Sequence, residues 1–326
     1  MINSASLFKI KNPSEFELSA LAVFKFQAEN NAVYRAFLNY LNFDYQKVSS
    51  LKAIPFLPIQ FFKTHRILSV DKPIQETFLS SGTTGMQQSK HFVSDLSLYE
   101  TSYLKGFQYF YGNITDYTIL ALLPSYLERN GSSLIYMVAD LIKKSRKPKS
   151  GFYLNNLDDL AKTLIALDQK GEKVMLIGVS FALLDLIEKH NFHLKNTIIM
   201  ETGGMKGRRK ELIRAALHQQ LCLGFGVSKI HSEYGMTELL SQAYSKGAGF
   251  FNTPPWMKIS IRDTEDAFSF LPIGQAGGIN VIDLANLNSC AFIATQDLGK
   301  IYTNGTFEIL GRFDNSDIRG CNLLVG

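Results

Sequence analysis

The sequence has few cysteines and lacks the long apolar runs of membrane proteins. Its three cysteines, an odd and sparse set among 326 residues, are typical of reduced thiols rather than of a disulfide framework. No Cys/His spacing resembles a zinc site, and no apolar run approaches the ~18 residues that a membrane span needs. The first residues have neither a basic nor an apolar signal-peptide region, so we expect a cytoplasmic protein without a signal peptide.

Positive charge is concentrated rather than spread. Of 34 basic residues, nine form two clusters, and the other 25 are outnumbered by 29 acidic residues. A general nucleic-acid face would need a broader basic stripe, so no nucleic-acid partner is expected. The cluster at 143–149 fits either a solvated helix end or a docking patch for an acidic partner. The two clusters consist of Lys143, Lys144, Arg146, Lys147 and Lys149, and of Lys206, Arg208, Arg209 and Lys210.

The first two thirds of the chain predict an α/β fold. Apolar residues recur at helical spacing through 13–50, and two prolines then favour an extended segment at 54–59. Ser94-Asp95 has the character of a helix N-cap before a helix from Leu96 to Phe110. Short apolar strands then alternate with helices, which indicates a largely parallel sheet covered by helices. The expected strands are 117–123, 173–177, 196–200 and 229–232, and the expected helices are 132–144, 157–167, 181–190 and 207–220.

The pattern changes beyond Trp256. Short strands are expected at 277–282, 291–295, 300–302 and 306–310, joined by turn residues that include the hairpin signal Asn304-Gly305. This region predicts a small antiparallel β subdomain. We therefore divide the chain into a core of residues 1–310, with α/β structure to about 255 and β-rich structure over 256–310, followed by residues 311–326.

A glycine-rich run follows the apolar pair Phe78-Leu79, at the end of an expected short strand. Its small hydroxyl residues and glycines can build a tight loop whose N–H groups and hydroxyls converge on an anion, most plausibly a phosphate. The run is not a Walker loop, because no Gly-Lys-Ser/Thr follows at the required spacing, and Gly203-Gly204 does not fit a dinucleotide fingerprint. An ordinary turn is the alternative. The run comprises Ser80, Ser81, Gly82, Thr83, Thr84 and Gly85.

The order of five motifs resembles the adenylate-forming superfamily of acyl-CoA synthetases, luciferases and adenylation domains. These motifs are the run at 80–85, Gly203-Gly204, the segment Tyr234-Gly235-Met236-Thr237-Glu238, Asp297-Leu298-Gly299 and Gly311-Arg312-Phe313-Asp314. The chain is more closely similar to the LuxE-like acyl-protein synthetases. That resemblance rests on the segment 124–129 with Ser132-Ser133-Leu134, on Glu201-Thr202-Gly203-Gly204, and on Arg319-Gly320-Cys321.

The resemblance implies ATP-dependent activation of a carboxylic acid, most plausibly a fatty acid, to an acyl-adenylate. The acyl group then passes to the enzyme's own cysteine, and a partner acyl reductase or acyl carrier takes the thioester. ATP and Mg²⁺ are the implied cofactors. The carry-over implies that residues 80–85 hold the β- and γ-phosphates, that Thr237 holds the α-phosphate and that Glu238 holds Mg²⁺, a hard cation that prefers carboxylate oxygen.

The remaining nucleotide contacts carry over in the same way. Tyr234 and Gly235, with Gly203 and Gly204, would surround adenine, Asp297 would accept hydrogen bonds from both ribose hydroxyls, and Arg312 would stay charged near the ribose or phosphate. Each has a structural alternative: a core aromatic for Tyr234, a helix-start carboxylate for Glu238, a turn residue for Asp297 and a surface ion pair for Arg312. The acyl pocket should be lined by Tyr126, Ser132, Ser133, Gly178 and Phe181.

The sequence departs from the superfamily pattern in two places. Gln87 and Gln88 stand where most members carry a lysine, so Lys90, the next basic residue, is the candidate phosphate contact in its place. The superfamily's long C-terminal domain, with its catalytic lysine, is expected to be truncated to a hinge remnant with a cysteine-bearing tail at 311–326.

Of the three cysteines, Cys321 is the expected acyl acceptor, since a thiolate is the natural acceptor for an acyl-adenylate. Cys222 and Cys290 stand within apolar stretches and are expected to be buried and inert. Two other functions stay open: an acyl- or aryl-CoA ligase of the phenylacetate type, and a non-catalytic adenylate-fold scaffold.

Overall fold

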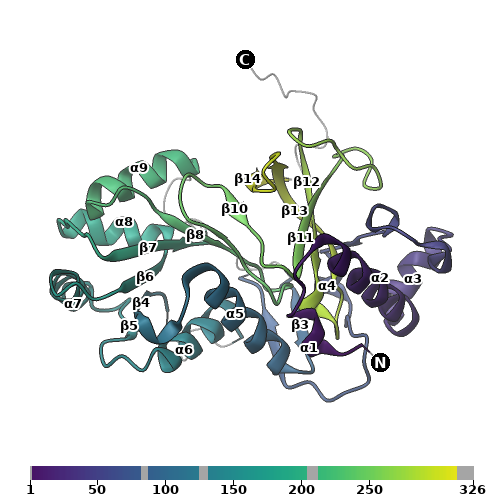
Figure 1. Ribbon diagram of the computed structural model, residues 1–326, viewed down its shortest axis with the longest axis horizontal. Helices are drawn as coiled ribbons and strands as arrows, with labels where there is room; N and C mark the ends of the chain where they lie inside the picture. The colour runs from purple at the N-terminus through teal and green to yellow at the C-terminus, as the bar shows by residue number, and fades with distance from the viewer. Residues whose placement is uncertain (1, 82–86, 125–130, 204–211, 314–326) are drawn as a thin grey trace.

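The computed structural model describes residues 2–81, 87–124, 131–203 and 212–313. Within them, five parallel strands form the half of the sheet at the left of Figure 1, in the order β8-β7-β6-β4-β5. Every residue of β4 and β6 is buried, as expected for central strands covered on both faces. The strands are β4 (Thr118–Leu122), β5 (Gly151–Phe152), β6 (Val174–Val179), β7 (Thr197–Thr202) and β8 (His231–Tyr234).

Helices cover both faces of this parallel region, with α8 and α9 on one side and α5 and α6 on the other (Figure 1). Alternation along β8 agrees with this: Ser232 contacts His218 of α9, and His231 contacts Tyr111 of α5. The predicted N-cap is confirmed, because the Asp95 carboxylate accepts from the Ser97 amide at 3.1 Å. The helices are α5 (Leu96–Tyr111), α6 (Ser133–Ser145), α7 (Leu157–Gln169), α8 (Ser180–Lys189) and α9 (Arg214–Phe225).

The predicted antiparallel region is also confirmed. It continues the same sheet in the order β11-β12-β13-β14-β10-β9-β8, so the parallel and antiparallel parts share backbone hydrogen bonds through β9 and β10. The expected strands at 291–295 and 300–302 are one long strand, and β14 runs through Arg312. These strands are β9 (Ala243–Ser245), β10 (Phe251–Asn252), β11 (Met257–Arg262), β12 (Ala276–Asp283), β13 (Phe292–Ile301) and β14 (Phe307–Arg312).

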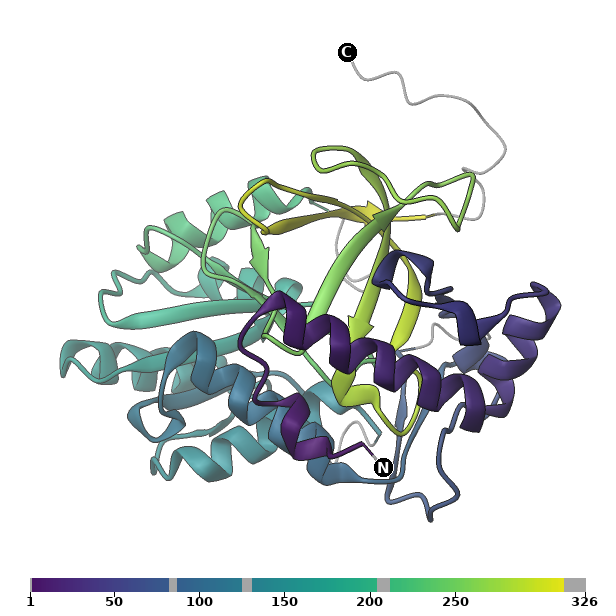
Figure 2. The same ribbon diagram turned by 45° about the vertical axis from the view of Figure 1, so that its right-hand side comes forward.

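The N-terminal helices pack against the antiparallel strands (Figure 2). Phe24 of α2 meets Phe292 of β13 edge to face, with ring centroids 5.8 Å apart, and Phe292 is fully buried. Burial of one such side chain contributes about 2 kcal/mol. The elements are α1 (Ser4–Leu7), α2 (Pro13–Asn30), α3 (Ala32–Tyr40), α4 (Phe61–Thr64), the short helices η1 (Tyr45–Lys47), η2 (Leu51–Ala53), η3 (Ile114–Asp116) and η4 (Leu284–Asn286), and β1 (Leu57–Pro58), which pairs with β13.

A separate hairpin carries the glycine-rich run. Its strands are β2 (Glu76–Leu79) and β3 (Lys90–Val93), and they pair antiparallel, so the run begins directly after β2, as predicted. The second strand of this hairpin was not predicted. None of the helices in the described part of the chain is long and apolar enough to cross a membrane.

Candidate active site

The carboxyl ends of the parallel strands bring several predicted site residues to one edge of the sheet. Ser132 and Ser133 begin the helix after β4, Gly178 lies near the end of β6, Gly203 follows β7, and Tyr234 ends β8. Ligands of open α/β sheets bind at this edge. The described residues do not include four parts of the predicted site: residues 82–85, Tyr126, Gly204 and Cys321.

Tyr234, Asp297 and Arg312 form one hydrogen-bonded cluster. The Tyr234 hydroxyl donates to Asp297 Oδ2 at 2.8 Å, and Arg312 Nε donates to Asp297 Oδ1 at 3.0 Å. Asp297 and Arg312 face each other across β13 and β14, so strand register sets this pair. The two bonds hold the carboxylate in one orientation, and its remaining lone pairs can still accept other donors.

The cluster combines two buried side chains with one exposed side chain. Tyr234 and Asp297 are buried, and burial raises the pKa of Tyr234 well above its usual value, with the Asp297 charge adding to the rise. The Arg312 side chain is 76% exposed, and Asp297 raises its pKa. The exposed Arg312 guanidinium therefore lies beside the buried Asp297 carboxylate. This arrangement is suited to a polar ligand bound at the surface of the cluster.

The segment from Met236 to Ser241 follows β8 and is anchored at several points. The Asp283 carboxylate accepts from the amides of Leu240 and Ser241 at 2.8 and 2.9 Å. Asn286 donates to the Glu238 carbonyl at 2.8 Å, and the Leu239 amide donates to the Met236 carbonyl at 3.1 Å. Thr237 and Glu238 are therefore held in a turn whose backbone groups have fixed partners.

The Glu238 carboxyl lies within electrostatic reach of this cluster. It is buried, and burial raises its pKa, while a hydrogen bond from the Ser89 hydroxyl and the Arg312 charge offset part of that rise. Glu238 is thus a desolvated carboxyl that a cation would stabilise in its charged form. Lys90 is exposed, and strand alternation directs it to the face opposite Ser89 and His91.

Two of the predicted acyl-pocket residues make packing contacts. A Cβ at Gly178 would come within 2.7 Å of Leu183 Cδ2, so the absent side chain lets α8 approach β6. Ser133 is buried, and its carbonyl accepts from the Tyr99 hydroxyl at 2.9 Å. Ser132 caps α6, and Phe181 is buried at the start of α8. Their proposed role toward the acid substrate remains a prediction.

Glu201 and Glu233 are polar groups at the same edge to which sequence reasoning assigned no role. Glu201 lies 3.5 Å from both Arg214 Nε and His218 Nε2 on the α9 side. Glu233 accepts from the Thr202 hydroxyl at 2.6 Å. Glu201 stands within the predicted motif at 201–204, and Glu233 directly precedes Tyr234. Their position at strand ends had marked both segments, although neither carboxyl was given a role.

We expect Glu233→Gln to stabilise the protein at alkaline pH. Burial raises the pKa of Glu233 to about 7, with Glu201 adding to the rise. A raised folded-state pKa gives stability that is complete below the unfolded pKa near 4.5 and is lost as pH rises through 7. Glutamine keeps the neutral shape, so the free energy of unfolding at pH 8 should rise by about 1–3 kcal/mol.

Urea unfolding of wild type and variant at pH 8 and at pH 4.5 measures this difference, which should vanish at the lower pH. The exposed Glu265→Gln serves as the matched control and should change neither value. A Glu233→Gln protein that is less stable than wild type at pH 8 would contradict the assignment.

The chain is similar to known proteins in sequence and in fold. A family model described as "Acyl-protein synthetase, LuxE" matches residues 11–326. The long-chain-fatty-acid–luciferin-component ligase of Vibrio harveyi is 23% identical over 325 residues, covering 92% of this chain and 84% of that protein.

Two solved structures are similar in fold. ATP-bound MatB from Rhodopseudomonas palustris has a TM-score of 0.56 at 19% identity, over 75% of this chain and 50% of that one. An open conformation of 2-hydroxyisobutyryl-CoA ligase in complex with 2-HIB-AMP and CoA has a TM-score of 0.66 at 13% identity, over 93% of this chain and 75% of that one. This chain therefore spans about half the length of the MatB structure. The likeness confirms the predicted adenylate-forming fold.

Proposed function

This chain belongs to the LuxE family of acyl-protein synthetases, and on that premise we propose that it activates a carboxylic acid with ATP and then acylates its own Cys321. In the first step a carboxylate oxygen attacks the α-phosphorus of ATP, the bond to the β-phosphate breaks, and pyrophosphate leaves. In the second step the thiolate sulfur attacks the acyl carbonyl, AMP leaves, and the thiol proton passes to solvent.

One observation carries the nucleotide assignment. Tyr234 of β8 meets Asp297 and Arg312 of the β13–β14 hairpin in one hydrogen-bonded cluster beside the turn at Thr237–Glu238. We propose that Asp297 binds the ribose, that Tyr234 and Gly203 contact adenine, and that Arg312 stabilises negative charge near the phosphates. Charge that develops as pyrophosphate departs is what such preorganised groups stabilise.

Glu238 is the proposed protein ligand for Mg²⁺. In the described part of the chain, no cluster of three or more His, Cys, Asp or Glu side chains could hold a metal alone. Mg²⁺ commonly takes one or two carboxylates and completes its shell with phosphate oxygens and water, so a single protein carboxylate is sufficient for the proposal. When bound, the ion would neutralise charge on the phosphates.

We propose a fatty acid as the substrate. Support comes from the Vibrio harveyi relative, which is named for a long-chain fatty acid. The helix start at Ser132–Ser133 and the segment Gly178–Phe181 adjoin the same sheet edge as the nucleotide cluster. The acyl group would then pass from Cys321 to an acyl reductase or an acyl carrier protein.

The described cysteines support Cys321 by elimination. Cys290 is fully buried, and burial raises its pKa to about 12. Burial also raises the pKa of Cys222, which is partly buried on α9. Both are therefore poor thiolates. Both are also free thiols, in keeping with a proposed site of action in the reducing cytoplasm.

Incubation with ATP, Mg²⁺ and a panel of radiolabelled carboxylic acids tests this function. We expect label on the protein, held through a bond that hydroxylamine cleaves, and pyrophosphate in the medium. Label that appears on added coenzyme A instead would indicate an acyl-CoA ligase. Absence of pyrophosphate release with every acid would indicate a non-catalytic scaffold instead of an enzyme.

A further inference from the structure

Strand β3 places two polar side chains against the Thr237–Glu238 turn. Ser89 directly precedes the strand and His91 is its second residue, so the two lie on one face. His91 reaches the carbonyl of Thr237, and Ser89 reaches the carboxyl of Glu238. Two residues on one face of the hairpin therefore contact two consecutive residues of the turn. His91 and Thr237 are 146 positions apart in the sequence.

The His91 contact defines the tautomer of its ring. Nδ1 lies 2.8 Å from the Thr237 carbonyl oxygen, and because a carbonyl can only accept, Nδ1 carries the proton. The side chain is 1% exposed, and burial lowers its pKa to about 4, so the ring is neutral near pH 7. Phe62 meets it edge to face, with centroids 5.6 Å apart, which restricts its rotation.

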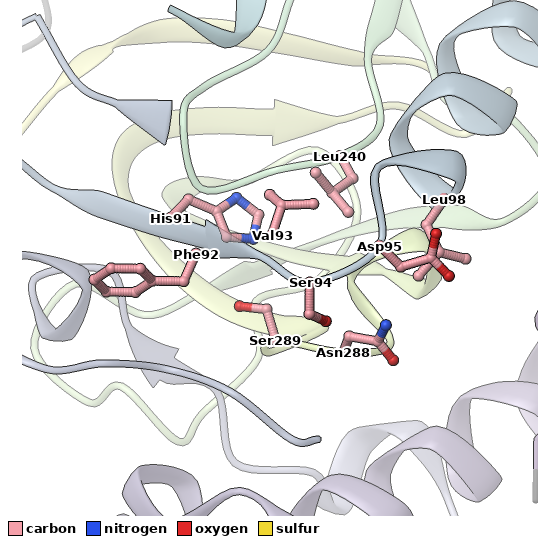
Figure 3. A pocket seen from close by; sticks show the side chains of 9 residues that line it. All are labelled: His91, Phe92, Val93, Ser94, Asp95, Leu98, Leu240, Asn288 and Ser289. Atoms are coloured by element: carbon pink, nitrogen blue, oxygen red, sulfur yellow. The ribbon is translucent and has the colours of Figure 1, made fainter. Parts of the chain in front are cut away.

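His91 and the neighbouring Ser94 line a small cavity. Figure 3 shows His91 and Ser94 at the wall of this cavity, which has a volume of about 10 Å³. Among the described residues, neither His91 Nε2 nor Ser94 Oγ has a hydrogen-bond partner. The donor at Nδ1 is thus the ring's one hydrogen bond within the described structure, and it is directed at Thr237.

Ser89 also pairs with the first residue of the glycine-rich run, Ser80. Its amide donates to Ser80 Oγ at 2.9 Å, its carbonyl accepts from the Ser80 amide at 3.1 Å, and Gln88 Nε2 donates to the Ser80 carbonyl at 2.8 Å. One residue therefore bonds both the first residue of the run and the carboxyl of Glu238. Ser89 therefore links the first residue of the run, through its backbone, to the turn, through its side chain.

We propose that Ser89 and His91 are positioning residues that hold the Thr237–Glu238 turn in register with the glycine-rich run during adenylation. The inference rests on the proposed function, because it assigns the phosphates to the run and Mg²⁺ to Glu238. The Ser89 hydroxyl orients the Glu238 carboxyl, and the His91 ring fixes the position of the Thr237 carbonyl and, with it, of the adjoining Glu238 backbone.

The first arm of the test compares His91→Leu with His91→Asn in acid-dependent exchange of pyrophosphate into ATP. The asparagine amide can replace the Nδ1–H donor, whereas leucine leaves the Thr237 carbonyl unpaired. We expect His91→Leu to lower kcat about tenfold to hundredfold with little change in the KM for the acid, since small misplacements of reacting groups cost this much. His91→Asn should recover most of the rate.

The second arm uses the Mg²⁺ concentration. The Ser89 hydroxyl contacts the carboxyl of Glu238, the proposed Mg²⁺ ligand, so Ser89→Ala should increase the Mg²⁺ concentration needed for half-maximal rate. His65→Leu, at an exposed histidine outside the site, is the matched control and should leave the rate unchanged.

Variants with wild-type kcat and wild-type Mg²⁺ dependence would overturn the inference alone. So would a loss in His91→Leu that asparagine does not rescue and that follows a lower melting temperature, because this would indicate a role in folding only. Wild-type protein without any exchange would overturn the proposed function and the inference with it.

Discussion

Cys321→Ser is expected to abolish stable acylation of the protein while acid-dependent release of pyrophosphate continues. The serine hydroxyl is not ionised near neutral pH and lacks the nucleophilicity of a thiolate, so acyl label on the protein should fall by at least about a hundredfold. In the proposed reaction Cys321 acts only after the acyl-adenylate has formed, so the first half-reaction should persist. The measurement is radiolabelled acid retained on denatured protein, with pyrophosphate assayed in the same tube.

Cys222→Ser provides the matched control, since Cys222 is the partly exposed one of the two cysteines that the structure describes. It should retain full labelling. Label that persists on Cys321→Ser, or that disappears from Cys222→Ser, would contradict the assignment of the acceptor. Loss of pyrophosphate release in Cys321→Ser would show that the cysteine also takes part in activation.

Glu238→Gln is expected to slow adenylation by about 10²–10³-fold, because a cation ligand at the phosphates contributes several kcal/mol to the transition state. The fold should survive. Burial already raises the pKa of this carboxyl, and Asn286 bonds the Glu238 backbone carbonyl rather than its side chain. The rate loss should therefore come without a lower melting temperature.

Acid-dependent pyrophosphate exchange across a series of Mg²⁺ concentrations measures this effect, and excess Mg²⁺ should restore part of the rate. The exposed Glu29→Gln is the control. A Glu238→Gln enzyme with the wild-type rate at every Mg²⁺ concentration would show that the ion is held elsewhere.

Local sequence patterns predict much of this fold. The apolar run at Val174–Val179 is a fully buried central strand, and Asn304-Gly305 is the hairpin between β13 and β14, with Gly305 at a φ of +82°. Such features need only neighbouring residues, because a run's period or a turn's backbone requirement is a local property.

Features that depend on distant partners could not be predicted in the same way. Strand β10 has two residues and shows no period, yet with β9 it joins the parallel and antiparallel parts of the sheet. Strand β11 is a different case: Met257–Arg262 alternates apolar and polar residues, so the signal for it was present and was missed.

The candidate site likewise contains features that the sequence predicts and features that depend on distant partners. Motif order predicts that Tyr234, Asp297 and Arg312 share a role, and the structure brings them together. The contacts of Ser89 and His91 with the turn at 237–238 have no counterpart in the sequence, because nothing local to either segment marks the other. Residues that support a site through tertiary packing therefore emerge only from coordinates.

Acid-dependent exchange of radiolabelled pyrophosphate into ATP tests the central claim most directly, because it detects the acyl-adenylate without any assumption about the acyl acceptor. The purified chain is incubated with ATP, Mg²⁺ and one carboxylic acid at a time. We expect label to enter ATP with fatty acids, to be absent without acid, and to fall sharply in Glu238→Gln. Exchange that is absent with every acid, or that proceeds equally without acid, would contradict the account.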